Sequence, residues 1–566
     1  MEDKEMKKCK KSIALLLAVV SLLAICLGGC GGSGNASETV ASATGTASQD
    51  SSIILAQTSE VANLNPMIQP RTPDSNAQCL IFSFLVTPDE QLNYVGDLAE
   101  SWDISEDGTV YTFHLRQDVK WHDGENFNAD DVIFTLTSLA APTYTGGNES
   151  RVMSIVGAKE YQAGEADSVS GLKKIDDYTV EMTLLAPNAA FLANMYTSML
   201  PEHILKDVDP GDWGTDDFNR APIGTGKYKF VEWKAGQYIK LERNDDYYGQ
   251  LPSIKYVTLQ FGADTTLVAA LMNGEIDVLY GLPSSEAENV MAMPNSTVYN
   301  YEQMTVYYIG LNQLDPALSD LRVRQALAHA LDKQTILDTV YGDTAYVCDD
   351  VFPSNHWSHS ENVAVYEYNP EKAMSLLEEA GYVMNESTGY YEKDGKTLHL
   401  TYDMSTSTDG KSVAALIQQY WKAIGVEMEV IEQDFATLAY TKLLPDNATK
   451  ETTADSFQCY TLGFGVEADP EEYNGYFSTS TGAGSWNFIH YSNAKVDELF
   501  QQQLLLSDPE ERAACFHEIA ELISEDVPWL PLYNKAGLIG LSNRVQDYVC
   551  DFRGAFFQIE KWNIAE

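Results

Sequence analysis

Strand-type and helix-type segments alternate along most of this chain, and this order constrains the fold more than any other feature. From Ser52 onward, short runs with alternating apolar residues, such as 110–116 (VYTFHLR), are interspersed with runs in which apolar residues recur at helical spacing, such as 321–331. The order strand, helix, strand is clearest in residues 398–404, 411–424 and 426–432. The pattern predicts a mixed α/β protein.

The length and the charge further limit the number of packed units, the structural class and the partners of this chain. A chain of 566 residues with 44% hydrophobic residues exceeds what one core needs, so we expect two or three packed units. Its charged fraction of 21% and aromatic fraction of 11% exclude wholesale disorder and coiled-coil repeats. The 83 acidic residues outnumber the 36 basic ones and give a net charge of −47, which repels a phosphate backbone and excludes a nucleic-acid partner.

The N-terminus has the pattern of an export signal. A basic stretch precedes sixteen apolar residues, 12–27, whereas a membrane-spanning helix needs about twenty. The tetrapeptide Leu27-Gly28-Gly29-Cys30 is similar to the lipobox of bacterial lipoproteins, in which the cysteine is acylated. We therefore expect a lipoprotein signal peptide at 1–29 and lipidation at Cys30; an ordinary signal peptide with a chance cysteine is the alternative.

Residues 30–51 are small and polar and contain no aromatic residue, so they cannot bury a core. We expect a flexible tether with an end-to-end distance of about 25 Å, holding a folded body close to the membrane. The predicted location is the extracytoplasmic face of a bacterial cell membrane, or the periplasm if the cell has two membranes.

The residues offer little support for catalysis or metal binding. The five cysteines after Cys30 are odd in number and contain no CxxC pair, so no disulfide framework is predicted. The nucleophile elbow G-x-S-x-G and the nucleotide-binding fingerprints are absent. His356 and His359 lie three positions apart but lack a carboxylate at ligand spacing. We expect no catalytic residue, no metal and no cofactor.

Five passages together resemble the family 5 solute-binding proteins of ABC importers, whose members bind oligopeptides, dipeptides and nickel. They occur in the order of the family and span nearly the whole chain after the tether. The passages are 98–134 (LAESWDISEDGTVYTFHLRQDVKWHDGENFNADDVIF), 221–230 (APIGTGKYKF), 307–312 with 320–332, 463–473 (GFGVEADPEEY) and 527–533 (VPWLPLY).

This resemblance implies an α/β, bilobal, periplasmic-binding-protein-like fold of the large type, whose lobes close over a ligand at a hinge. The chain would cross between the lobes at 301–305 and 530–535. The implied division is 52–75, 204–302 and 536–566 for lobe one, 76–203 for a subdomain inserted in lobe one, and 303–535 for lobe two.

The resemblance also implies ligand contacts on the segment 463–470. In peptide-binding relatives this segment crosses the floor of the cleft, begins Gly-Trp, and carries an aspartate that binds the α-ammonium of the ligand. Here Gly463 keeps the glycine, Phe464 replaces the tryptophan, Asp469 precedes the proline, and one residue is missing between them. Glu467 is the best candidate for the ammonium-binding acid; the alternatives are a solvated loop acid at 467 and a helix cap at 469.

Two further contacts follow from the same resemblance. Relatives pair the ligand backbone with an extended segment that corresponds to 68–72, in which Arg71 would meet a carboxylate unless it is an ordinary surface arginine. Trp486 is a candidate apolar wall for a ligand side chain, and an ordinary core tryptophan is the alternative.

The implied function is that of a monomeric, lipid-anchored receptor that captures a peptide-like solute and delivers it to a membrane permease driven by two ATPase subunits, without catalysing a reaction. Three alternatives stay open. The same scaffold would serve as a peptide-signal sensor without transport, or as a carrier of a nickel chelate or a sugar. An enzyme would require a catalytic constellation in the cleft.

Overall fold

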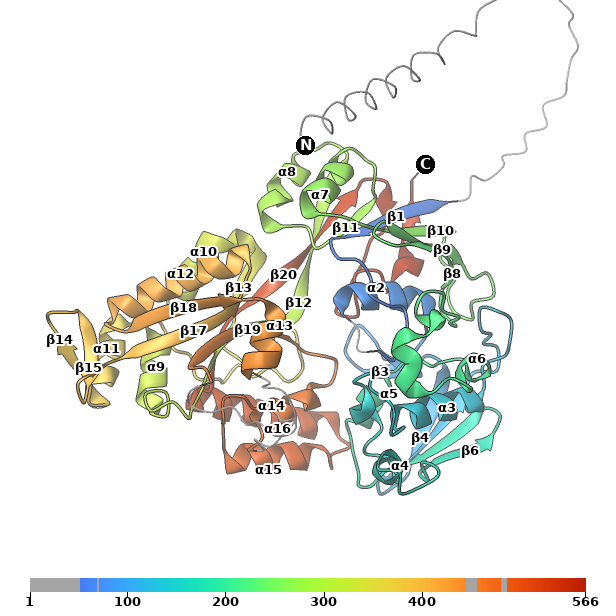
Figure 1. Ribbon diagram of the computed structural model, residues 1–566, viewed down its shortest axis with the longest axis horizontal. Coiled ribbons are helices and arrows are strands. Elements are labelled where there is room, and N and C mark those ends of the chain that lie inside the picture. The colour runs from blue at the N-terminus through green and yellow to red at the C-terminus, as the bar shows by residue number, and fades with distance from the viewer. Residues whose placement is uncertain (1–50, 69–70, 444–455, 480–485, 566) are drawn as a thin grey trace, which may run out of the picture. The chain divides into compact units, whose positions relative to one another are not determined.

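A computed structural model describes residues 51–68, 71–443, 456–479 and 486–565 (Figure 1). The predicted signal peptide, Cys30 and nearly all of the predicted tether lie outside the described residues. In the described part, no helix combines the length and the apolar character needed to cross a membrane.

An eleven-stranded mixed sheet organises the protein, in the order β18-β17-β19-β12-β20-β11-β1-β10-β9-β8, with β13 also paired to β20. In that order the strands are Glu427–Gln433, His399–Ser405, Cys459–Gly465, Ser296–Leu311, Trp529–Ser542, Val278–Tyr280, Ser52–Gln57, Tyr256–Phe261, Tyr238–Arg243 and Tyr228–Lys234, and β13 is Ala345–Val347.

The long strands β12 and β20 form an antiparallel pair at the centre of this sheet, and both extend from one half of it to the other (Figure 1). Their register is interrupted between the pairs Glu302–Ala536 and Val306–Asn534. The predicted crossing segments 301–305 and 530–535 lie in these strands, at and beside the interruption. Irregular pairing of this kind bends and twists a strand locally.

Buried residues form separate clusters on the two sides of the β12–β20 pair. The largest surrounds β1, β8, β9 and β10 and includes Trp121, Trp213 and Tyr228. A second packs helices α9 (Leu321–His329), α11 (Pro370–Glu379) and α12 (Thr408–Ala423) against β17 and β18, with Trp421 fully buried. The parallel pairing of β17 and β18 confirms the β-α-β unit expected at 398–432.

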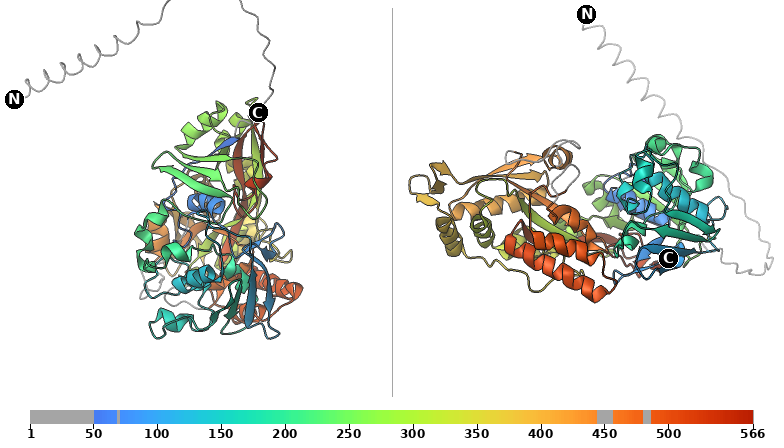
Figure 2. Two further views of the ribbon diagram at one scale, coloured as in Figure 1. Left: turned by 90° about the vertical axis from the view of Figure 1, so that its right-hand side faces the viewer. Right: turned by 90° about the horizontal axis from the view of Figure 1, so that it is seen from below.

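Helices α15 (Ala494–Gln503) and α16 (Pro509–Asp526) lie side by side and, with the short α14 (Asn474–Phe477), contribute to a third cluster (Figures 1 and 2). Asp508 caps α16 by accepting hydrogen bonds from Glu510 and Glu511.

A second, four-stranded antiparallel sheet has the order β4-β5-β7-β6, with bounds Ala99–Ile104, Val110–Leu115, Thr179–Thr183 and Leu172–Asp176. Helix α3 (Ala129–Leu139) packs against β6 and β7 and is capped at its N-terminus, because the Asn128 side chain accepts from Asp130 N–H. The hairpin of β2 (Val86–Pro88) and β3 (Tyr94–Gly96) precedes β4.

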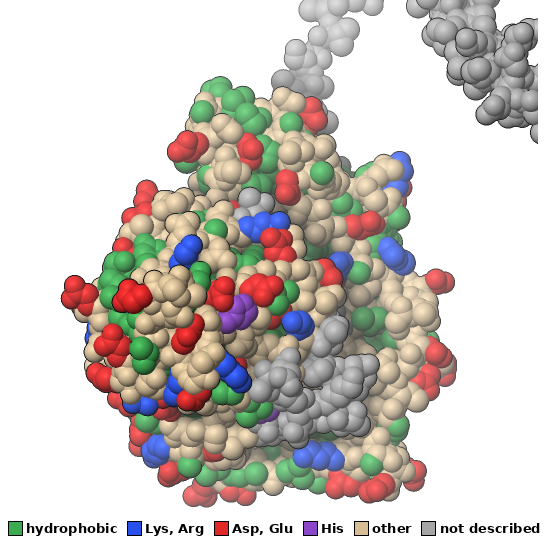
Figure 3. All heavy atoms as spheres, turned by 60° about the vertical axis from the view of Figure 1, so that its left-hand side comes forward, with side chains coloured by type: hydrophobic (Ala, Val, Ile, Leu, Met, Phe, Trp, Pro, Cys, Tyr) green, Lys and Arg blue, Asp and Glu red, His purple; other side chains and the backbone are tan. Residues whose placement is uncertain are grey.

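The remaining elements are short and connect these units. They are α2 (Thr72–Ile81), α4 (Ala158–Gln162), α5 (Phe191–Met195), α6 (Glu202–Leu205), α7 (Asp264–Met272), α8 (Ala287–Met291), α10 (Lys333–Val340), α13 (Phe435–Thr437), β14 (Val383–Asn385), β15 (Tyr390–Lys393), β16 (Lys396–Thr397), β21 (Val545–Gln546) and β22 (Asn563–Ile564). Acidic side chains are spread over the face drawn in Figure 3 rather than gathered in one patch.

Candidate ligand-binding site

The candidate segment 463–470 begins inside β19, and its glycine is required by a neighbouring ring. Gly463 pairs with Tyr307 of β12, and a Cβ at this position would lie 2.8 Å from the Tyr307 ring. Tyr307 stacks on Tyr533 of β20, with ring centroids 4.8 Å apart. Gly463 therefore lets two central strands bring this aromatic stack against the start of the segment.

Phe464 belongs to an aromatic cluster. Its ring centroid lies 4.5 Å from that of Tyr476, 4.9 Å from Tyr473 and 6.2 Å from Trp529. Trp486 lies at the edge of the same cluster, 5.7 Å from Tyr476, with 41% of its surface exposed. Trp486 is thus a partly exposed aromatic and not a core tryptophan.

Glu467 combines an immobilised backbone with an exposed side chain. His356 lies 3.0 Å from the Glu467 carbonyl through Nε2, and its Nδ1 accepts from Ser358 N–H. Burial lowers the pKa of His356 to about 4, so at neutral pH the ring is uncharged and donates its Nε2–H to the carbonyl. The backbone is held in place while the carboxylate stays available.

A second carboxylate lies beside the first. The Glu467 N–H donates to Glu472 Oε1 at 3.2 Å. Burial, followed by the negative charge of Glu467, raises the pKa of the Glu472 carboxyl above its usual value. Two neighbouring carboxyls of this kind favour a cation, which relieves their repulsion.

Residues from a distant part of the sequence interact electrostatically with these acids. Burial, followed by the charge of Glu467, raises the pKa of the Tyr196 hydroxyl, and the charges of Asp469 and Glu467 add to the same effect of burial on Tyr94. Arg151 exerts the opposite influence on Glu472. Its Nη1 donates to the Tyr196 carbonyl at 3.0 Å, which orients the guanidinium.

Asp469 is already engaged by protein groups. Arg512 Nη1 and Nη2 donate to its two carboxylate oxygens at 2.5 and 2.8 Å, and Glu471 N–H donates to Oδ1 at 3.0 Å. The side chain caps the 3-10 helix Pro470–Tyr473, and a helix cap is the alternative role that the sequence offered for Asp469. Asp469 therefore supports the segment, next to the position of Glu467.

A cavity of about 610 Å³ adjoins this segment. One wall comes from the β2–β3 and β4–β5 turns and from residues before and within α5, and the other from Trp357, the end of the candidate segment and the α15–α16 connection. The lining includes Leu92, Tyr94, Ile104, Tyr111, Pro187, Leu192, Trp357, Ala468, Asp469, Leu504, Leu505, Leu506, Arg512 and Ala513.

Arg71 lies away from this cavity lining. It is the residue before α2, and its guanidinium binds Asp74 at 3.1 Å and the Glu60 carbonyl at 2.9 Å. The segment 68–72 was expected to be extended, but Thr72 already begins α2, because Asp74 accepts from Arg71 N–H and starts the helix. Residues 69–70 lie outside the described part.

Several residues near the site carry no signal in the sequence. Tyr94, Arg151 and Tyr196 lie about 270 to 370 positions before Glu467, and no local motif marks them. Glu472 is different, because a second acid five residues after Glu467 is visible in the sequence and would have suggested a paired site.

The histidines and cysteines of the described part show no sign of a reactive centre. His359 Nδ1 bonds to Asp350 at 2.9 Å, while His356 faces the Glu467 carbonyl, so the two rings do not form a pair. Within the described ranges no group of three or more His, Cys, Asp or Glu residues is arranged to hold a metal ion. The five cysteines described, Cys79, Cys348, Cys459, Cys515 and Cys550, are all free.

The periplasmic binding proteins share a mixed α/β architecture of this kind. Solved structures of that class match this chain over 91% of its length. The model for bacterial extracellular solute-binding proteins, family 5 Middle, matches residues 93–485, and the chain belongs to this family. The members of this family are extracytoplasmic solute-binding proteins of ABC transporters, and their role in the family is binding rather than catalysis.

Two relatives illustrate the range of ligands. The oligopeptide-binding protein AppA of Bacillus subtilis is 29% identical over 99% of this chain and its own whole length, and its structure with a nonapeptide matches with a TM-score of 0.75 and 28% identity, covering 91% of this chain and 100% of that one. NikZ of Campylobacter jejuni in complex with Ni(L-His) also matches with a TM-score of 0.75 and 28% identity, over 91% of this chain and 99% of NikZ.

Proposed function

We propose that this protein captures peptides for an ABC importer and that Glu467 binds the ligand's terminal ammonium. The observation that carries the proposal is the exposed Glu467 carboxylate on a backbone held by His356 and Glu472. The family and the peptide-bound relative support peptides as the class of ligand.

The expected energy of this contact is sufficient to matter. A charge-assisted hydrogen bond contributes about 1.5–3 kcal/mol, compared with roughly 8 kcal/mol for micromolar affinity. Phe464 and Trp486 would form the aromatic wall of the same cleft, and Gly463 would contribute backbone beside the Tyr307 ring. Asp469 would act by supporting the segment, and Arg71 would keep its contact with Asp74.

Ligand capture would be coupled to closure of two lobes, with lobe one formed by 52–75, 204–302 and 536–566, the inserted subdomain by 76–203, and lobe two by 303–535. The register interruption between β12 and β20 supports a hinge there, since irregular pairing tolerates bending more readily than a regular ladder. Only the closed, liganded form would dock productively on the permease with its two ATPases.

We further propose that residues 1–29 are a signal peptide, that Cys30 is lipidated, that 30–51 tether a monomer to the membrane, and that two acyl chains provide the anchor. Expression in a bacterium and detergent-phase partitioning of wild type and Cys30→Ser test this part. Wild type should enter the detergent phase and the variant should not; equal partitioning would argue against lipidation.

The test of peptide capture is a thermal-shift and calorimetric titration of the detergent-solubilised protein with tri- to nonapeptides, their N-acetylated forms, Ni–histidine and heme. Saturating peptide at a hundred times its Kd should stabilise the protein by about 2.7 kcal/mol. Glu467→Ala should weaken binding about tenfold to 100-fold, whereas Glu498→Gln on α15 should not. If only Ni–histidine or heme stabilises the protein, the ligand is that solute and not a peptide.

A further inference from the structure

The cavity beside the candidate segment has a mainly apolar lining. Its walls carry Leu92, Leu192 and Trp357, and two of its apolar side chains are conspicuously exposed, Ile104 at 48% and Leu505 at 64%. Isolated exposed apolar residues need no explanation, but these two border one cavity from opposite walls. An apolar ligand group entering the cavity would remove both from water.

Three of the four charged residues that line the cavity are paired with protein, and the fourth, Glu106, is exposed to solvent. Arg512 and Asp469 neutralise each other. Asp107 accepts from the Ser105 hydroxyl at 2.7 Å and from the Thr109 hydroxyl at 2.8 Å, and these bonds hold the β4–β5 turn. These groups are satisfied without a ligand, so they do not call for an ionised side chain in the cavity.

One polar atom in the lining is different. The Tyr94 hydroxyl is buried and has no hydrogen-bond partner among the described residues. A buried polar group without a partner costs free energy, so such groups commonly meet a ligand or an ordered water. Burial, followed by the negative charges of Asp469 and Glu467, raises the pKa of this hydroxyl above its usual value, so it stays protonated. It is therefore a hydrogen-bond donor.

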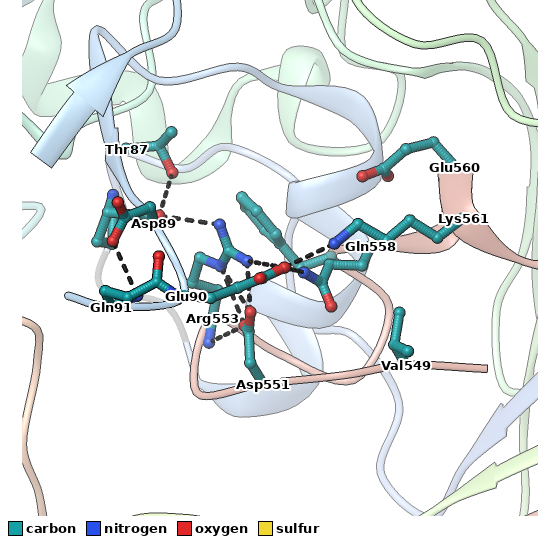
Figure 4. A network of polar contacts seen from close by, with 12 residues as sticks. Thr87, Asp89, Glu90, Gln91, Val549, Asp551, Arg553, Gln558, Glu560 and Lys561 are labelled. Carbon is teal, nitrogen blue, oxygen red and sulfur yellow. Dashed lines mark hydrogen bonds and ion pairs between the residues drawn. The ribbon is translucent and has the colours of Figure 1, made fainter. Parts of the chain in front are cut away.

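The loop that carries Tyr94 is held rigidly. Gln558 Nε2 and Lys561 Nζ both donate to Glu90 Oε1 at 2.6 Å, and Arg553 Nη1 donates to the Pro88 carbonyl at 2.9 Å (Figure 4). Within the loop, Leu92 adopts the left-handed conformation with φ +67°, which bulky side chains rarely adopt. The C-terminal segment thus fixes the turn from which Leu92 and Tyr94 line the cavity.

We propose that this cavity is a specificity pocket that takes a large apolar side chain of the bound peptide, and that the Tyr94 hydroxyl donates a hydrogen bond to a carbonyl of that peptide. The inference rests on the proposed function, because the peptide's ammonium would be held by the adjacent Glu467. A carbonyl is the fitting acceptor, since the nearby carboxylates repel an anionic group. The volume of about 610 Å³ accommodates an aromatic side chain with space remaining.

Calorimetry with Ala-based tetrapeptides tests the pocket. Gly, Leu, Phe, Asp or Lys is placed in turn at the first, second and third positions, and binding is measured for wild type, Ala513→Phe, Ala514→Phe and Tyr94→Phe. Ala513 lines the cavity, whereas its neighbour Ala514 is exposed on α16 and serves as the matched control.

At one position the Phe peptide should bind at least tenfold more tightly than the Gly peptide to wild type and to Ala514→Phe. Ala513→Phe fills the pocket, so this ratio should fall to about one while the Kd of the Gly peptide stays within about twofold. Tyr94→Phe should weaken Phe and Gly peptides alike, about three- to tenfold, because every peptide has the carbonyl.

Equal binding of all side chains, or a Phe preference that survives Ala513→Phe, would overturn the pocket while leaving peptide capture intact. Unchanged affinity in Tyr94→Phe would overturn the role of the hydroxyl. If no peptide binds wild type, the proposed function fails and this inference fails with it.

Discussion

Arg512 donates hydrogen bonds to both carboxylate oxygens of Asp469, and its guanidinium carbon lies 5.5 Å from the centre of the Trp357 ring. The Arg512 and Asp469 side chains are both buried, and Gln503 Oε1 accepts a hydrogen bond from Arg512 Nε at 2.8 Å. The pair joins the first turn of α16 to the end of the segment that carries Glu467. The position of the candidate ammonium-binding acid therefore depends on a contact 43 residues away in the sequence.

The first prediction concerns this ion pair. Asp469→Ala leaves Arg512 buried without its partner, and we expect the free energy of unfolding to fall by about 3 kcal/mol. Urea denaturation measures the loss. The matched control is Asp118→Ala, which removes the partner of Arg116 in an exposed pair 3.0 Å apart and should cost less than about 1 kcal/mol. Similar losses in both variants would contradict the assigned importance of Asp469.

The second prediction uses Glu471, next to the segment. Burial raises the pKa of its carboxyl to about 7, so in the folded protein this carboxyl stays protonated up to about that pH. The contribution of this group to stability is complete below its unfolded pKa near 4.5 and declines as the pH rises through about 7. Glu471→Gln should therefore gain stability relative to wild type between pH 5 and pH 8, as measured by urea unfolding at several pH values. A difference that does not change with pH would show that the carboxyl titrates normally.

The third prediction distinguishes two neighbouring histidines. Burial lowers the pKa of His356 to about 4, whereas the hydrogen bond to Asp350 raises the pKa of His359 above its usual value. In NMR spectra of histidine-labelled protein between pH 5 and pH 8, the His359 ring signals should shift and those of His356 should stay at their neutral positions. His356→Ala and His359→Ala assign the signals, and titration of His356 in this range would contradict its buried donor role.

The fourth prediction concerns the central strands. A Cβ at Gly537 of β20 would lie 2.1 Å from the Tyr301 ring, so Gly537→Ala should displace this ring and cost about 1–3 kcal/mol. Adding Tyr301→Ala should recover part of the loss in a double-mutant cycle measured by chemical denaturation. Gly214→Ala is the control, because nothing lies within 4 Å of its Cβ position. An additive double mutant would exclude the steric explanation.

The fold was largely predictable because its signals are local. Alternating apolar residues at 110–116 predicted β5, helical spacing at 321–331 predicted α9, and the order strand, helix, strand at 398–432 predicted β17, α12 and β18. Each signal depends on residues a few positions apart, so the backbone preferences alone carry it.

The site was predictable only as a set of candidates. Sequence and resemblance together selected Glu467 and Asp469, but both are acids in a polar segment and the pattern could not separate their roles. The structure separates their roles, because Arg512 forms an ion pair with the Asp469 carboxylate, whereas the Glu467 side chain is exposed. For Trp486, only packing could decide between core and cleft edge.

By itself the sequence determined the alternation of strands and helices, the acidic charge, the helix caps and the family resemblance, all of which follow from short-range patterns or composition. Only the tertiary structure brought Tyr94 and Tyr196 within electrostatic reach of Glu467 and built a cavity from turns and helix ends far apart in the chain. The physical reason is that a pocket and a buried ion pair are properties of packed surfaces. Residues several hundred positions apart interact in such a pocket or ion pair because burial of the core places them together. No local sequence pattern predicts this proximity.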